Sequence, residues 1–203
     1  MYGKDFKHCN TMELPVQFDN INRRVVDDLK EKLTAASSLS VAAASFSIYA
    51  FEALKKELEA VRELRFIFTS PAFNKDTAKK QQREFYIPKL NRERNLYGSE
   101  FEIRLRNQLS QKAIARECAE WIRRKVRFKS NVSGGVMNGF MNVVDGKGND
   151  FTYFPFNEFT TTELGIERGN NLCPGVMRLP SPYAEQYIRN FDELWRDKDR
   201  FQD

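Results

Sequence analysis

The sequence predicts an α/β domain in which helices flank a mixed β-sheet, and three observations lead to this fold class. Residues 37–48 are small and nearly uncharged, which is typical of a central strand covered on both faces, and residues 64–70 follow as a second buried strand. Residues 50–61 between them have a helical pattern, and a strand, a helix and a strand with short joints form a right-handed unit with parallel strands. A glycine-rich turn, DGKGND, joins two further strands, 136–144 and 151–157, as an antiparallel hairpin. A sheet with both kinds of pairing is therefore expected.

Two amphipathic helices are predicted in the first third of the chain. The first covers residues 23–35, where apolar residues recur at helical spacing and charged residues occupy the other side. The second is residues 50–61, whose apolar stripe would face the sheet. The residues expected to be buried in these helices are Val25, Val26, Leu29, Leu33, Phe51, Leu54, Leu58 and Val61.

A third, longer helix is predicted from Ser99 to about Lys125. Ser99 is followed by Glu102 three residues later, which is a capping box, and basic residues cluster at the other end, where the helix dipole is negative. A short strand, 126–130, follows this helix. The preceding residues 74–97 have no clean period and contain Pro88, so we interpret them as a long loop or an insertion.

The two ends of the chain are predicted to lie outside the domain proper. Residues 1–22 show no periodicity and are expected to be an irregular N-terminal lead, and the domain itself is expected to cover residues 23–165. Residues 166–203 are interpreted as a linker followed by a charged amphipathic helix from Tyr183. The linker assignment depends on the absence of a period and on three prolines, Pro174, Pro180 and Pro182.

Composition excludes several classes of protein. A chain of 203 residues with 41% hydrophobic and 30% charged residues predicts one globular domain with a core of its own. No run of about 18 apolar residues is present, so no membrane span is expected. The first residues contain no secretory apolar region, and three cysteines without a C-x-x-C motif argue against a disulfide framework, so a cytoplasmic location is expected. The cysteines are Cys9, Cys118 and Cys173.

The single histidine, His8, limits the chemistry further. Mechanisms and metal sites that need two histidines in one subunit are excluded, and His8 itself is expected to be a solvated terminal residue. Neither a G-x-x-x-x-G-K-[ST] loop nor a G-x-G-x-x-G loop after a strand is present. No metal and no cofactor are therefore expected.

Positive charge is concentrated in one region. The chain has a net charge of +5, but residues 75–129 contain 16 Lys and Arg against 7 Asp and Glu, a local +9, while the rest carries −4. Phe85 and Tyr86 lie among these cations and could stack on bases, which favours a nucleic-acid surface. The alternative is a solvated helix face whose charges serve solubility, with the two aromatic residues fixing a loop to the core. The residues predicted to bind nucleic acid are Lys79, Lys80, Arg83, Arg92, Arg94, Arg123, Arg124 and Arg127.

Two stretches carry a resemblance to a known family. Residues 46–73, FSIYAFEALKKELEAVRELRFIFTSPAF, and FNEFTTTELG resemble the phospholipase D-like domain that precedes the motor of bacterial restriction-associated (type III / superfamily-2) helicases. The resemblance covers about residues 23–165 and implies one half of a phospholipase D-like domain. The tail from Tyr183 is similar to the approach to such a motor. The resemblance thus implies a helicase motor in the same natural chain, and a helicase or restriction enzyme as the parent protein.

The catalytic motif of the phospholipase D family is altered in this sequence. Family enzymes use His-x-Lys-x4-Asp on a strand, with the histidine as nucleophile, and an asparagine at a following strand end. Asp145 falls at the aspartate position, but Asn138 replaces histidine and Phe140 replaces lysine, while Asn157 can match the asparagine. An amide cannot form the phosphohistidine and a phenyl ring supplies no cationic stabilisation, so the motif is degenerate. The alternative is that Asp145 only begins a turn and Asn138 is an interior polar residue of a strand.

Three functions follow from these observations. The first is a non-catalytic accessory domain of a restriction or helicase protein that binds nucleic acid, with DNA as the expected partner, or positions the motor. The second is a protein-interaction or dimerisation module, in which the former active-site face, lined by Phe140, Phe154 and Phe156, binds a partner or forms a homodimer. The third is a residual phosphodiesterase or nuclease.

Overall fold

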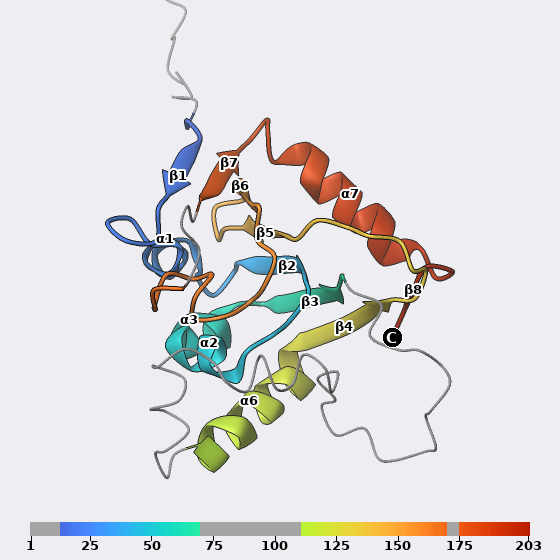
Figure 1. Cartoon of the computed structure of the whole chain (residues 1–203), viewed down its shortest axis with the longest axis horizontal. Coiled ribbons are helices and arrows are strands. Elements are labelled where there is room, and N and C mark those ends of the chain that lie inside the picture. The colour runs from blue at the N-terminus through green and yellow to red at the C-terminus, as the bar shows by residue number, and fades with distance from the viewer. Residues whose placement is uncertain (1–12, 70–110, 170–174) are drawn as a thin grey trace, which may run out of the picture.

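The eight strands of the described chain form one sheet. A computed structural model of the protein describes residues 13–69, 111–169 and 175–203 (Figure 1). The strand order is β1-β7-β6-β5-β2-β3-β4-β8. The strands are β1 (Val16–Phe18), β2 (Ser38–Ala43), β3 (Glu63–Phe68), β4 (Val126–Asn131), β5 (Phe140–Val144), β6 (Asp150–Phe154), β7 (Val176–Pro180) and β8 (Phe201–Gln202).

The pairing of the strands is mixed, as the sequence predicts. Strand β2 is parallel to β3, and β3 is parallel to β4, whereas all other neighbours are antiparallel. The β5–β6 hairpin is formed around the predicted glycine-rich turn. The α/β class with a mixed sheet flanked by helices is therefore confirmed.

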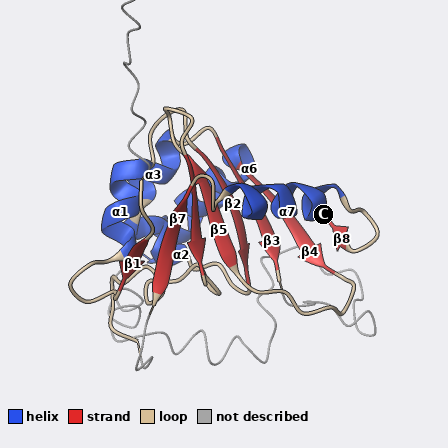
Figure 2. Cartoon of the chain, turned by 90° about the horizontal axis from the view of Figure 1, so that it is seen from above, coloured by secondary structure: helices blue, strands red, loops and turns tan. Residues whose placement is uncertain are grey.

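Helices cover the two faces of the sheet unequally. Helix α7 lies across one face, and the remaining helices cover the other (Figure 2). The described helices are α1 (Val25–Lys32), α2 (Ile48–Ala53), α3 (Lys55–Ala60), α6 (Gln111–Lys125) and α7 (Glu185–Arg196). The helix predicted at 50–61 is interrupted at Leu54, whose φ of −115° and ψ of 16° are not helical, although Leu54 and the rest of the predicted stripe are buried.

Each face has its own apolar core. The larger core lies under α1, α2, α3 and α6 and contains a group of aromatic rings, in which Phe46 stacks on Phe159 with ring centroids 5.2 Å apart. The smaller core lies under α7, where Ala42, Ile67 and Phe140 of the sheet contact Phe191. The molecule therefore has three layers, helix, sheet and helix, only where α7 covers the sheet.

Two segments that the sequence assigns to a lead and a linker contain strands. Strand β7 lies inside the predicted linker 166–182 and pairs with both β6 and β1, and β1 lies inside the predicted lead 1–22. The sequence of β7 lacks the alternation of apolar and polar residues that predicts a strand, because Arg178 occupies a buried position and Pro180 ends the strand. Strands β1 and β8, with three and two residues, are too short to leave a periodic pattern.

The predicted hairpin strands are longer than the observed ones. Residues 136–139 precede β5 and are not part of a strand, and Val136 is 98% exposed. Strand β6 ends at Phe154 because Pro155 has no N–H for the ladder. The predicted loop 74–97 and the predicted helix start at Ser99 lie outside the described residues. No helix among the described residues has the length and apolar character that crossing a membrane requires.

Candidate nucleic-acid interface

The structure brings two positions of the altered family motif together at one end of the hairpin. Asn138 and Asn157 are both exposed, and the Oδ1 atom of Asn157 accepts a hydrogen bond of 3.4 Å from the backbone N–H of Gly139. A Cβ atom on Gly139 would lie 2.2 Å from the carbonyl oxygen of Phe156, so only glycine allows this close approach. The two amides therefore mark the end of β5 where the motif begins.

Asp145 lies at the other end of β5, in the hairpin turn. The five residues of β5 span about 17 Å and separate Asp145 from the two asparagines. Its Oδ1 accepts hydrogen bonds from the backbone N–H groups of Lys147 and Asn149, and its Oδ2 accepts one from the Asn149 side chain. Partial burial acts to raise the pKa of Asp145, but these hydrogen bonds outweigh it and hold the pKa below its usual value. In this structure Asp145 begins a turn, which is the alternative that the sequence left open.

Phe140 is covered by α7 instead of forming part of a partner surface. Its side chain is 6% exposed and contacts Tyr187, with ring centroids 5.6 Å apart, and Phe191. Phe156 is fully buried in the larger core, and only Phe154 is partly exposed. The predicted interaction surface of Phe140, Phe154 and Phe156 is therefore wrong, because helix α7 and the core already occupy two of its three side chains.

Three of the eight basic residues predicted to bind nucleic acid are described, and all three are exposed. Arg123 and Arg124 lie on the last turn of α6, and Arg127 follows on β4. Lys125, between them, donates hydrogen bonds to the carbonyl oxygens of Glu59 and Val61 and so fixes the end of α6. The other five, Lys79, Lys80, Arg83, Arg92 and Arg94, lie outside the described residues, as do Phe85, Tyr86 and His8.

A surface groove of about 420 Å³ lies between β4 and the end of α7. It is lined by Arg127, Phe128 and Lys129 of β4, by Trp195 of α7 and by Asp203. The Nζ atom of Lys129 lies 5.4 Å from the centroid of the Trp195 ring. Neither Arg127 nor Lys129 forms an ion pair with another residue of the described chain. The groove thus has an exposed cation, Arg127, and a largely buried one, Lys129, which is 9% exposed, beside an indole.

Arg65 lies behind this groove and serves the fold. Strand register places it beside Arg127 on the same face, but its guanidinium donates to Ser40 and, at 2.8 Å, to Asp192. The guanidinium carbon also lies 5.0 Å from the Phe191 ring centroid and 5.7 Å from that of Trp195. Asp192 compensates the charge of Arg65, and Arg65 holds α7 and the indole in place.

Sequence reasoning missed Lys129, Trp195 and Arg65. Lys129 belongs to the basic segment 75–129 and lies two positions after Arg127 on β4, so the two-residue period of a strand is a signal that places both on one face. Trp195 lies within the amphipathic helix predicted from Tyr183. Nothing in the sequence shows that this helix lies across β4, so its part in the groove could not be foreseen.

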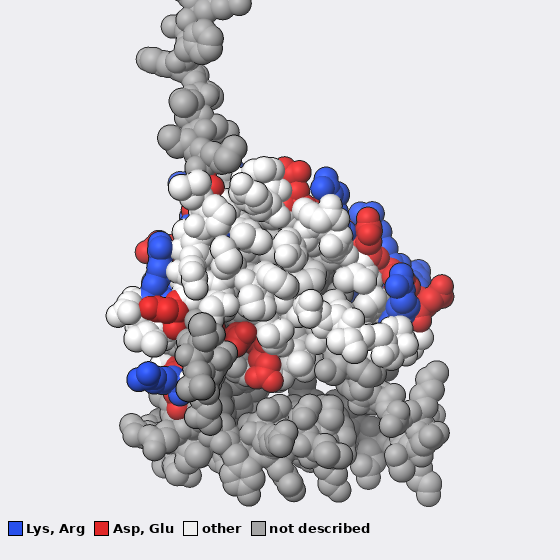
Figure 3. Space-filling model, turned by 45° about the horizontal axis from the view of Figure 1, so that its top comes forward, with Lys and Arg blue, Asp and Glu red and all other residues white. Residues whose placement is uncertain are grey.

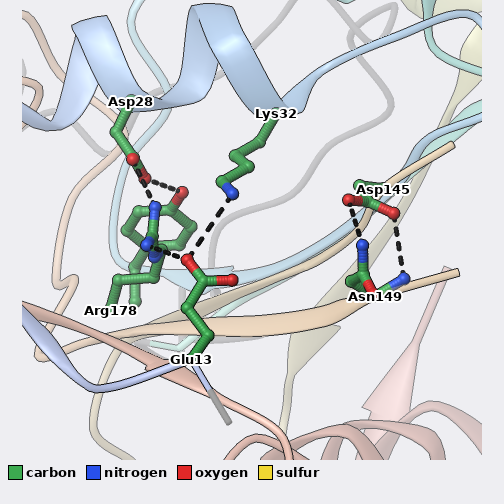
Figure 4. A network of polar contacts seen from close by, with 7 residues as sticks. Glu13, Asp28, Lys32, Asp145, Asn149 and Arg178 are labelled. Atoms are coloured by element: carbon green, nitrogen blue, oxygen red, sulfur yellow. Dashed lines mark hydrogen bonds and ion pairs between the residues drawn. The ribbon is translucent and has the colours of Figure 1, made fainter. Parts of the chain in front are cut away.

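A second cluster of charges lies on the opposite face of the sheet, between α1 and β7 (Figure 4). The guanidinium of Arg178 donates to the carboxylates of Asp28 and Glu13, and Lys32 lies 3.6 Å from the same Glu13 carboxylate. The hydroxyl of Tyr153 donates a hydrogen bond of 2.5 Å to Asp28. Burial, with the nearby Asp28 charge, raises the pKa of Tyr153 well above its usual value, so this hydroxyl stays protonated. The cluster joins α1 to β6 and β7.

The charge pattern does not make the whole molecule basic. Figure 3 shows a broad, mostly uncharged face with acidic residues in its lower part and with basic and acidic residues alternating along the α7 side. On α7, Arg189 forms an ion pair with Glu185, and just after the helix Arg200 forms one with Asp197. Among the described residues, no group of three or more His, Cys, Asp or Glu side chains is placed to hold a metal ion.

Comparison with known proteins identifies no family for this chain. No family model matches the sequence, and no curated protein matches it. Among solved structures, a similar chain is the polyphosphate kinase from Porphyromonas gingivalis, with 10% sequence identity and a TM-score of 0.36. The match covers 86% of this chain and 21% of the kinase, so this chain spans about a fifth of the kinase's length.

Proposed function

We propose that this chain is a non-catalytic, phospholipase D-like domain that binds nucleic acid through the groove between β4 and α7. In this proposal the domain belongs to a restriction or helicase protein and helps to position the motor of the same natural chain on nucleic acid. The family assignment depends on the sequence resemblance, and the binding role depends on the residues of the groove.

The altered motif supports the absence of catalysis. A phospholipase D-like enzyme needs a nucleophile and a cation close together at the reacting phosphorus. Here Asn138 provides only an amide, and the side chain at the lysine position, Phe140, is buried beneath α7. The remaining acid, Asp145, is engaged in a turn at the far end of the strand. We therefore expect a generic phosphodiester reporter to be left intact by the purified chain.

The proposed binding depends on one observation: the side chains of Arg127 and Lys129 lie on the same face of β4. Both side chains line the groove without an acidic partner among the described residues other than Asp203 of the groove itself. Arg123 and Arg124 are exposed on the turn of α6 that leads into β4, but α6 covers the other face of the sheet. The two cations of the groove wall attract a polyanion and position its phosphates without reading its sequence.

The proposal is tested by measuring affinity for labelled oligonucleotides as a function of salt. Binding should weaken as salt rises from about 50 to about 200 mM, because each phosphate contact releases condensed counterions. In the double variant Arg127→Gln/Lys129→Gln, the slope of log K against log salt should fall by about 1.4 to 1.8, since each contact contributes about 0.7 to 0.9. Affinity at the lower salt should fall with it.

A matched control separates the groove from general charge. Lys147 is exposed on the hairpin turn at the far end of β5 and forms no ion pair with a described residue, so Lys147→Gln removes one charge away from the groove. It should leave affinity and slope nearly unchanged. Absence of binding at the lower salt, or equal losses per charge in the groove variants and the control, would show the proposal to be wrong.

A further inference from the structure

We infer that the groove takes single-stranded nucleic acid, with an unpaired base against Trp195 and the backbone along Arg127 and Lys129. This inference depends on the proposed function, because it names the kind of nucleic acid that the same groove binds. The observation behind this inference is the indole of Trp195 in the groove, because binding by electrostatic attraction alone would not require an aromatic ring.

The two walls of the groove differ in chemistry. The β4 wall supplies Arg127 and Lys129, which are two residues apart on one face of the strand and so about 7 Å apart along it. The α7 wall supplies the Trp195 ring. A strand of nucleic acid has the same two-sided character, with charged phosphates on one side and flat bases on the other, so it matches the groove in charge and in polarity.

The indole is held in position before any ligand binds. Phe191, one helical turn earlier, stacks on Trp195 with ring centroids 5.8 Å apart and an interplanar angle of 15°. The cationic groups of Arg65 and Lys129 lie within 6 Å of the indole centroid. Because Arg65 is itself fixed by Asp192 and Ser40, the ring has little freedom left to lose on binding. A fixed aromatic surface is the kind of platform on which bases stack in proteins that bind single strands.

The groove is large enough for one nucleotide unit. Its volume of about 420 Å³ is near the lower end of the range for clefts that hold small ligands. In a duplex the base faces are already stacked, so Trp195 could reach one only by separating the pairs. Asp203 at the groove opposes a phosphate and so limits the affinity of any polyanion.

The test compares three probes on the full chain: oligo(dT) of about ten nucleotides, an abasic strand of the same length, and a duplex. Oligo(dT) should bind about tenfold more tightly than the abasic strand, and more tightly than the duplex. Trp195→Leu should remove the difference between oligo(dT) and the abasic strand, whereas Trp195→Phe should retain most of it. Asp203→Asn should tighten the binding of both single strands, since it removes a carboxylate and leaves the ring.

Fluorescence gives a second readout that does not depend on affinity. The chain has two tryptophans, and Trp121 is fully buried with its Nε1 donating to the carbonyl oxygen of Leu58. Oligo(dT) should therefore quench only Trp195, and the quenching should disappear in Trp195→Phe, whose unfolding curve shows whether the fold is intact. Equal binding of oligo(dT) and the abasic strand, or duplex binding as tight as oligo(dT), overturns this inference and leaves the proposed function standing. Failure of all three probes to bind overturns both.

Discussion

The guanidinium of Arg65 on β3 donates a hydrogen bond of 2.8 Å to the carboxylate of Asp192 on α7, and so joins the sheet to the helix that covers its second face. The side-chain amide of Asn142 on β5 adds a second polar link, to the carbonyl oxygen of Tyr187. Apolar contact with Phe191 completes the attachment. Helix α7 is therefore fixed in rotation as well as in position, because the polar links can form in only one orientation of the helix.

Replacing Asp192 by asparagine should loosen α7 and destabilise the fold by about 1 kcal/mol. The side chains of Arg65 and Asp192 are 27% and 35% exposed, so solvent screens part of the attraction and a larger loss is not expected. Urea unfolding measures the change. Glu193→Gln is the matched control, since Glu193 is the exposed neighbour of Asp192 on the same helix. This variant should lose less than about 0.5 kcal/mol of stability. Equal losses in the two variants would contradict the role of the Arg65–Asp192 pair.

The central part of this fold could be predicted because local patterns determine it. An uncharged stretch, an amphipathic helix and a second apolar stretch specify β2, α2–α3 and β3 with parallel strands, and the glycine-rich turn specifies the β5–β6 hairpin. In each case the residues that make the element are adjacent in the sequence. Hydrophobic periodicity and turn chemistry act over that distance.

The edges of the sheet and the groove could not be predicted for the opposite reason. Strands β1, β7 and β8 exist because each pairs with a strand far away in sequence, and none has a strong pattern of its own. In β7, Arg178 occupies a buried position because it forms ion pairs with residues that are distant in the sequence. A charged residue in a sequence normally indicates an exposed position, so the pattern of β7 is misleading. The groove likewise needs α7 to lie across β4, and the composition of the helix does not specify which strands it covers.

Replacing Gly139 by alanine should destabilise the protein by about 1 to 3 kcal/mol. The added Cβ would lie 2.2 Å from the carbonyl oxygen of Phe156 and 2.6 Å from the Cα of Asn157, and both are backbone atoms that cannot rotate away. The chain would have to separate at the point where residue 139 pairs with residue 156. Urea unfolding provides the measurement. Gly135→Ala is the control, because its Cβ would meet only the Ser133 hydroxyl, at 3.3 Å, and it should cost much less.

Cys118 should be unreactive in the folded protein and should make stability depend on alkaline pH. Burial raises the pKa of its thiol to about 12, whereas an exposed thiol titrates near pH 9. Below about pH 9 the thiol is protonated in both states; between pH 9 and 12 only the unfolded chain ionises, so stability falls as pH rises, by at most about 1.4 kcal/mol per pH unit. Urea unfolding between pH 8 and 11 should show that the wild type loses more stability than Cys118→Ala as the pH rises.

A thiol reagent checks the same burial directly. In the Cys9→Ser/Cys173→Ser variant, Cys118 is the remaining cysteine, and at pH 8 it should react only after denaturant is added. Rapid reaction of the native variant would show that the site is open to solvent.

Arg178 and Asp28 should be strongly coupled, and the coupling should be visible in a double-mutant cycle. Their side chains are 6% and 10% exposed, and Arg178→Met would leave the Asp28 carboxylate buried with only the Tyr153 hydroxyl and no cation in direct contact. Removing one partner of a buried pair costs about 3 to 5 kcal/mol, because the other charge stays buried and uncompensated. Arg178→Met should reach this range in urea unfolding.

The double variant Arg178→Met/Asp28→Asn should lose less than the sum of the two single losses, since neither charge then remains to be compensated. Glu13 provides the comparison within the same cluster. Its carboxylate also accepts from Arg178, but its side chain is 42% exposed, so water can replace the contact and Glu13→Gln should cost less than about 1 kcal/mol. If the losses from Arg178→Met and Asp28→Asn simply add, each residue acts through packing alone, and the ion pair does not stabilise the junction of α1 with β7.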